Sequence, residues 1–218
     1  YVRQAHSKDR QEAQEGHQKI EQICGRLLRD IERKLPKDRK QQYASDLELY
    51  WQILNQKRYD SNKIYSVHEP AVNCISKGKA HRQYEFGCKV AVVRNSKSGV
   101  ITGMKSFADN TYDGHTLEPA LEQCERIRAM LEGSRPKEAV VDRGCKGKKE
   151  IDGTQISIPH KPSDKTTAYE KRKLRKKFRA RAAIEPVIGH LKHDHRMKRN
   201  YLSGTEGDAV NALMAGAA

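Results

Sequence analysis

The spacing of the apolar residues changes near Tyr59, and this change constrains the fold more than any other feature of the sequence. In residues 10–34 the apolar positions recur in steps of three and four, which predicts an amphipathic helix. Pro36 ends that helix, and apolar and aromatic positions in residues 43–54 predict a second helix. We expect the two helices to pack as a hairpin, with the aromatic side chains in its core rather than stacked on bases.

Beyond this helical region the chain alternates strand and helix patterns. Residues 84–93 and 99–107 are rich in β-branched and aromatic residues, and turn-forming residues 94–99 lie between them, which predicts a β-hairpin. A helix capped by Thr116 is predicted over residues 117–131.

The last third of the chain adds strands and a long helix. Residues 138–142 form a short apolar run between helices, which suits a buried strand parallel to its neighbours, and residues 155–158 predict another strand. A basic helix is expected from about Tyr169. This order indicates an α/β domain whose first strand is missing, because residues 64–67 are too short and Pro70 ends them.

We therefore expect a helical hairpin in residues 1–60 and an incomplete α/β domain in residues 61–218. The chain begins with Tyr1, its first methionine is Met104, and its last helical pattern has no stop signal, so we expect a fragment. Lys and Arg number 43 against 28 Asp and Glu, a net charge of +15 that favours a nucleic-acid partner over a merely solubilising excess. Scattered cysteines and short apolar runs predict a soluble intracellular protein without disulfides or membrane spans.

Asp142 is the first candidate site residue. It ends a predicted buried strand and precedes a glycine-containing loop, residues 143–147, where open α/β sheets bind their ligands. An aspartate that caps the following turn would give the same pattern, and position alone does not separate the two interpretations.

The second candidate is the series Phe178, Arg181, Glu185 and Lys192. Offsets of three, seven and fourteen place these side chains within about 60° of arc on a straight helix. A glutamate on a partly apolar face needs a partner or a metal, although an Arg181–Glu185 ion pair would satisfy it too. Pro186 predicts that the helix is kinked or restarts beside Glu185.

The basic segment 171–181 carries eight Lys or Arg in eleven residues. Such density suits contact with phosphates along a groove, and the alternatives are a localisation-like patch or a solvated helix face.

These motifs resemble those of insertion-sequence transposases, bacterial DDE enzymes with a ribonuclease H-like fold. The second candidate matches their Y-x2-R-x3-E-x6-K signature, and residues 141–147 (VDRGCKG) resemble the segment that bears their second catalytic aspartate. Further similar segments occur in the same order over nearly the whole chain: residues 64–70, 78–81, 110–117, 200–202 and 207–213.

The resemblance implies a mixed sheet flanked by helices and a triad of two aspartates and one glutamate. Asp142 would be the second acid and Glu185 the third, both binding Mg²⁺ or Mn²⁺ in a two-metal mechanism of DNA cleavage and strand transfer. The partners implied are double-stranded DNA, both transposon ends and target, and a second copy of the chain in a synaptic complex. The implied location is the bacterial cytoplasm, at the nucleoid.

Seven residues are assigned to DNA by the signature and the basic segment: Arg175, Lys176, Lys177, Phe178, Arg179, Arg181 and Lys192. Phe178 departs from the tyrosine of the signature, so a phenolic hydrogen bond is lost while stacking is kept. The first aspartate of the triad would lie upstream, and neither Asp60 nor Glu69 replaces it, so we expect this chain alone to be inactive. The alternatives are a non-catalytic nucleic-acid-binding protein and an inactivated relic; an enzyme requires Asp142 and Glu185 to converge.

Overall fold

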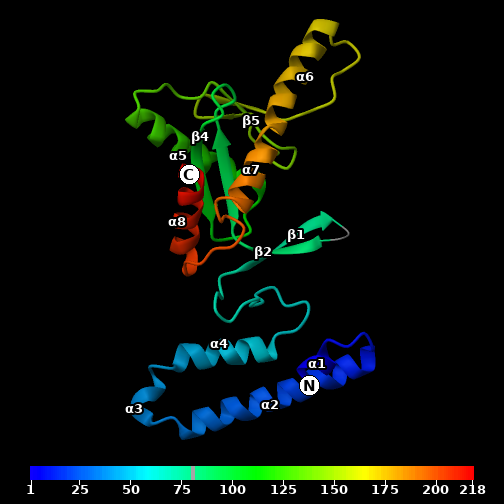
Figure 1. Cartoon of the computed structure of the whole chain (residues 1–218), viewed down its shortest axis with the longest axis vertical. Helices are drawn as coiled ribbons and strands as arrows, with labels where there is room; N and C mark the ends of the chain where they lie inside the picture. The colour runs from blue at the N-terminus through cyan, green and yellow to red at the C-terminus, as the bar shows by residue number, and fades with distance from the viewer. Residues whose placement is uncertain (80–81) are drawn as a thin grey trace. The chain divides into compact units, whose positions relative to one another are not determined.

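The computed structural model describes residues 1–79 and 82–218, which form two compact units, Tyr1–Pro70 and Ala71–Ala218 (Figure 1). Ala80 and His81, which belong to the similar segment 78–81, lie outside the described residues.

The first unit is helical. It contains α1 (Val2–Ala5), α2 (Arg10–Lys34), α3 (Lys37–Lys40) and α4 (Ala44–Asn55). The two long helices expected from the sequence are confirmed, and α2 begins where the Asp9 carboxylate accepts hydrogen bonds from two backbone N–H groups. Trp51 on α4 donates its indole N–H to Glu32 on α2 at 2.7 Å, which ties the two helices together.

The second unit begins with four strands in two hairpins: β1 (Asn73–Lys79), β2 (Arg82–Gly87), β3 (Lys89–Arg94) and β4 (Ile101–Phe107). The prediction of one strand over residues 84–93 was wrong, because the strand is interrupted after Gly87. The backbone φ of Gly87 is 142°, a value that residues with a side chain rarely adopt. The part before the break pairs with β1, which the sequence did not predict, and the part after it pairs with β4.

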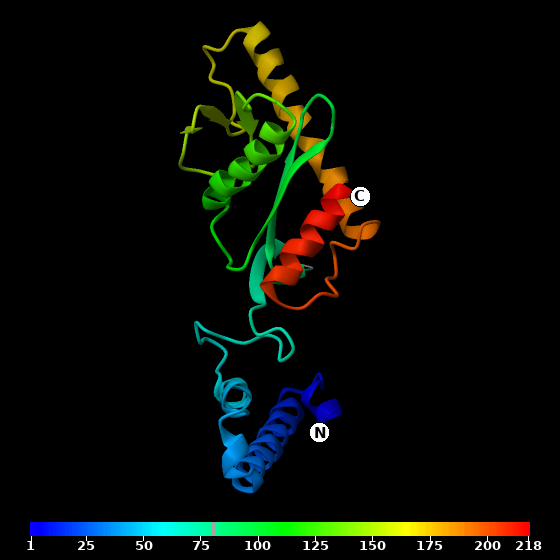
Figure 2. The same cartoon turned by 90° about the vertical axis from the view of Figure 1, so that its left-hand side faces the viewer.

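The core of this unit lies around the β3–β4 hairpin. Helices α5 (Leu117–Met130) and α8 (Gly204–Ala217) cover its opposite faces (Figure 2). Met104 is buried with Leu191, Ala212 and Ala215, and Gly216 lies so close to Met104 that a side chain there would collide with it. The predicted cap of α5 was wrong, since the Thr116 hydroxyl donates instead to the Asp113 carbonyl within η1 (Asp113–Thr116).

The remaining strands form a third small sheet in the order β5–β7–β6. These strands are β5 (Glu138–Val140), β6 (Glu150–Ile151) and β7 (Thr154–Ser157), with β5 parallel to β7 as predicted. The strand β5 is partly exposed rather than buried as expected. The described residues therefore form a mixed α/β unit with three separate sheets in place of the single mixed sheet that was expected.

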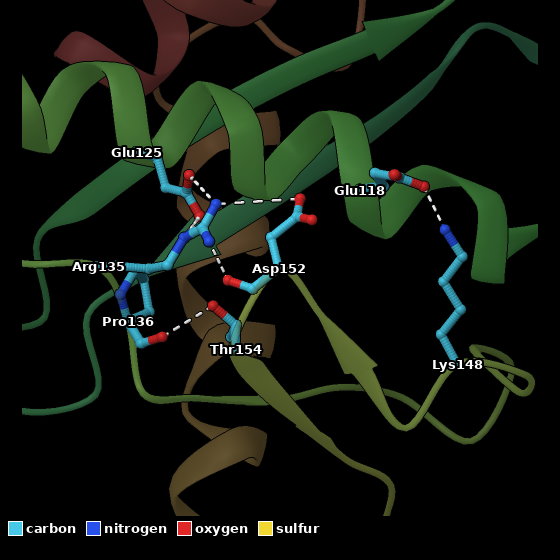
Figure 3. Close-up of polar contacts among 7 residues, drawn as sticks. All are labelled: Glu118, Glu125, Arg135, Pro136, Lys148, Asp152 and Thr154. Carbon is cyan, nitrogen blue, oxygen red and sulfur yellow. Dashed lines mark hydrogen bonds and ion pairs between the residues drawn. The ribbon is translucent and has the colours of Figure 1, made fainter.

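Ion pairs hold the third sheet against α5 (Figure 3). The Arg135 guanidinium forms a two-point pair with Glu125 on α5 and also contacts Asp152 in the β6–β7 turn, and Lys148 pairs with Glu118. The Thr154 hydroxyl, fully buried, donates to the Pro136 carbonyl at 2.8 Å. These contacts fix the chain on both sides of β5, the strand that leads into Asp142.

Replacing Thr154 with valine is expected to lower the free energy of unfolding of the second unit by about 1–3 kcal/mol, because the Pro136 carbonyl loses the hydrogen bond that it accepts from a fully buried hydroxyl. Chemical denaturation measures the change. Thr111→Val is a matched control, since the Thr111 hydroxyl makes only a 3.4 Å contact at a partly exposed site. Equal denaturation midpoints for the Thr154 variant and the unmodified chain would show that the hydrogen bond from Thr154 to Pro136 does not stabilise the unit.

Candidate functional site

The helix pair α6 (Ala168–Ala182) and α7 (Ile184–His193) carries the signature residues. A capping box between Thr167 and Glu170 begins α6. The regular helix is interrupted at Ala183, and Pro186 lies in the first turn of α7, which confirms the predicted restart. Glu185 consequently lies in the first turn of a new helix, where a negative charge is favoured by the helix dipole.

Asp142 follows β5 by two residues and begins a tight turn. Its Oδ1 accepts a hydrogen bond from the Arg143 backbone N–H at 2.7 Å, and its carbonyl accepts one from Cys145 at 3.1 Å. The carboxylate thus has the local turn contact that the sequence left open. Its side chain is 70% exposed, so the turn does not bury it.

Arg181 links the two candidate acids. One guanidinium nitrogen lies 3.4 Å from Asp142 Oδ1, and the other lies 3.2 Å from Glu185 Oε1. The arginine side chain is 23% exposed, whereas those of the two acids are about 70% exposed. The structure therefore brings together two carboxylates, 43 residues apart in the chain, around one cation.

The chemistry of this pair suits a divalent metal in part. Carboxylate oxygens are the hard ligands that Mg²⁺ and Mn²⁺ prefer, and both side chains are reachable from solvent. Among residues 1–79 and 82–218 no cluster of three or more His, Cys, Asp or Glu side chains is placed to hold a metal ion. Asp142 and Glu185 could thus supply two of the ligands of such an ion.

The loop after Asp142 is held by side chains outside the set of site residues predicted from the sequence. The Tyr112 hydroxyl accepts a hydrogen bond from the Lys146 N–H at 3.1 Å. Lys89 on β3 forms an ion pair with Asp113 at 3.0 Å, and Asp113 lies directly against Gly144. The similarity of residues 110–117 to the transposases was the available signal, but the contacts span more than thirty residues of sequence.

A cavity of about 470 Å³ lies between α6 and the loop that follows β7. Its apolar lining includes Leu174 and Phe178, and the Phe178 ring meets the His160 ring edge-on at 5.7 Å. The cationic side chains around it are Arg143, Lys171, Arg175 and Arg179. Two of the seven residues assigned to DNA, Arg175 and Arg179, therefore surround an aromatic surface formed by a third.

Lys177 has a different setting from the other basic residues of α6. Its ammonium group forms an ion pair with Glu138 on β5 and donates to the Ser157 hydroxyl on β7 at 2.7 Å. Partial burial would raise the pKa of Glu138, but hydrogen bonds from Lys177 and Ser157 outweigh it and the pKa is lowered. Lys177 thus joins α6 to the third sheet, whereas Lys176 is exposed and Lys192 on α7 is partly buried. A DNA contact of Lys177 remains a prediction.

Comparisons with known proteins bear on this geometry. A family model described as "Transposase DDE domain" matches residues 60–218, which include Asp142, Arg181 and Glu185. No curated protein and no solved structure was found to match the chain. No helix in the described ranges has both the length and the apolar content that crossing a bilayer requires.

Proposed function

Because this chain belongs to the family of the transposase DDE domain, we propose that it cuts DNA at the ends of a mobile element and joins them to target DNA. The observation that best supports this proposal is the pairing of Asp142 and Glu185 with one guanidinium. A protein that only binds nucleic acid needs no such convergence of acids in a basic region, which makes that alternative weaker.

DDE transposases use divalent metal ions, and we assign Mg²⁺ or Mn²⁺ to this pair. When bound, the ions activate the attacking oxygen and stabilise the leaving oxygen of a phosphodiester. Asp142 and Glu185 hold anionic oxygens at one solvent-accessible place, at the end of β5 and the start of α7. Arg181 and the exposed basic residues of α6 bind the phosphates that flank the scissile bond.

A third carboxylate is assigned to a further strand, because no third acidic side chain in the described part of the chain joins Asp142 and Glu185 in a metal-binding cluster. In the described part of the chain β3 pairs only with β4, and β5 pairs only with β7, so each has an unpaired edge. A strand bearing an aspartate that paired with both edges would join the hairpin to the third sheet. The partners we assign are double-stranded DNA and a second copy of the chain.

The proposal is tested by adding such a strand upstream and measuring Mg²⁺-dependent cutting of duplexes that carry the element's ends. Cutting that depends on both the added aspartate and the metal supports the proposal. A chain that binds the duplex but never cuts it, with the strand present, would instead be a relic or a binding protein.

Basic residues of α6 should differ in their effect on DNA affinity. Lys176→Gln with Arg179→Gln is expected to weaken binding to all sequences and to reduce the slope of log affinity against log salt by about 1.8, or about 0.9 for each lost phosphate contact. Lys177→Gln is the contrasting variant, because its ion pair with Glu138 is internal, and it should lower the unfolding midpoint with little change in slope. Fluorescence anisotropy at several salt concentrations measures the slopes. An unchanged slope in the double variant would show that this face of α6 contacts solvent rather than DNA.

A further inference from the structure

We propose that Arg181 keeps divalent cations from Asp142 and Glu185 until a DNA phosphate draws its guanidinium away. The inference rests on the proposed function, because it assumes that the two acids are metal ligands. It adds an order of events: the DNA end arrives first, and its arrival prepares the acids for the metal.

The position of the guanidinium supports exclusion of a second cation. Two of its nitrogens lie 3.4 Å and 3.2 Å from the two carboxylates, so a positive charge already lies between the groups that would bind the ion. A divalent cation brought to the same place would be repelled by that charge and would have to compete for the same oxygens. While Arg181 stays there, the affinity of the pair for metal is reduced.

The bridge is more than a helical ion pair. A contact between Arg181 and Glu185 alone would be the ordinary i,i+4 pair of a continuous helix. Here the pair crosses the break at Ala183, and the second nitrogen reaches Asp142 on the loop after β5. One side chain therefore contacts both acids from a third segment of the chain, and its movement would release both at once.

DNA offers the guanidinium an alternative partner of the same geometry. The planar fork of arginine binds phosphate as readily as carboxylate, often through two parallel hydrogen bonds. Arg181 ends the basic segment of α6, so phosphates bound along that segment would lie near it. Both acids are about 70% exposed, and ion pairs of such exposure are weak enough to exchange.

Coupling of this kind works in both directions. If DNA raises the affinity of the acids for metal, then metal must raise the affinity of the chain for DNA by the same factor. The protein would thus hold its metal weakly when free and strongly when a DNA end is in place.

Mn²⁺ binding to the whole chain, measured by electron paramagnetic resonance, tests this order of events. For the unmodified chain we expect weak binding that strengthens about three- to tenfold when a short duplex is added. Arg181→Gln should bind Mn²⁺ about three- to tenfold more tightly without DNA and should gain little from the duplex. Arg126→Gln removes the same charge from an exposed site on α5, where in the described part of the chain Arg126 forms no ion pair with either acid, so its DNA-free affinity should match that of the unmodified chain.

The inference is overturned if Arg181→Gln binds Mn²⁺ no more tightly than the unmodified chain. Arg181→Lys is a control for a folding defect, because lysine keeps the positive charge but lacks the planar guanidinium that contacts two carboxylates. Its Mn²⁺ affinity without DNA should lie between those of the unmodified chain and Arg181→Gln. Asp142→Asn and Glu185→Gln separate this result from the proposed function: if neither weakens Mn²⁺ binding in any state, the acids are not metal ligands.

Discussion

Glu185→Gln is expected to reduce DNA strand cleavage at least about a thousandfold, in a version of the protein that supplies the third carboxylate, while DNA affinity changes by less than about twofold. Glutamine has nearly the same shape, but it removes the anionic oxygen that a divalent cation requires. Its side chain is 68% exposed, so the loss of charge should not disturb folding. Cleavage of end-labelled duplexes and anisotropy titrations on the same preparation measure the two effects.

Glu206→Gln is a matched control for this experiment. Glu206 also lies in the first turn of a helix, α8, and is exposed, but it belongs to no ion pair with Arg181 among the described residues. The control should keep both cleavage and binding. If Glu185→Gln lost affinity and cleavage in equal measure, the carboxylate would act in binding DNA rather than in holding a metal.

Leu191→Ala should give the largest loss of stability in the second unit. Leu191 on α7 is 3% exposed and packs in the core cluster with Met104, Ala212 and Ala215. Removing a buried leucine side chain and leaving a cavity costs about 2–5 kcal/mol, which lowers the melting temperature of a unit of this size by roughly 5–15 °C. Calorimetry or thermal circular dichroism measures the shift.

Leu213→Ala separates burial from residue type. Leu213 is 45% exposed on α8, so the same substitution there should cost less than about 1 kcal/mol. Similar losses of stability in the two variants would show that the packing of α7 does not depend on its buried leucine. Since α7 also carries Glu185, the Leu191 variant should lose cleavage activity at temperatures below the melting point of the unmodified chain.

The sequence predicted the helices better than the strands. Residues 10–34 and 43–54 repeat their apolar positions over several turns, and the helices form within a residue of the expected bounds. The only sign that the strand run 84–93 is divided was Gly87, because the residues on both sides of it are strand-forming and the run otherwise reads as continuous. The strand β1 was missed because Ser76, Lys77 and Gly78 give it neither alternation nor an apolar run.

The meeting of Asp142 and Glu185 was easier to predict from the sequence than the contacts that support them. A strand that ends in Asp142 and a helix that bears Glu185 were expected to meet, and Arg181 contacts both acids. Spacing could not show which basic residue of α6 is internal, because Lys176 and Lys177 look alike until Glu138 is located. The Tyr112–Lys146 contact was equally hidden, since no local pattern encodes a hydrogen bond between residues 34 positions apart.

The interruption at Ala183 separates two helices with different roles. The helix α7 is anchored by Leu191, whereas the N-terminal part of α6 projects from the second unit (Figures 1 and 2). A continuous rod would transmit any bending forced on α6 by a curved duplex straight into the packed interior. Pro186 has no backbone N–H to continue the helical hydrogen bonds across Ala183, so a bend imposed on α6 by a duplex is expected there rather than within α7, which would keep Glu185 near the end of β5.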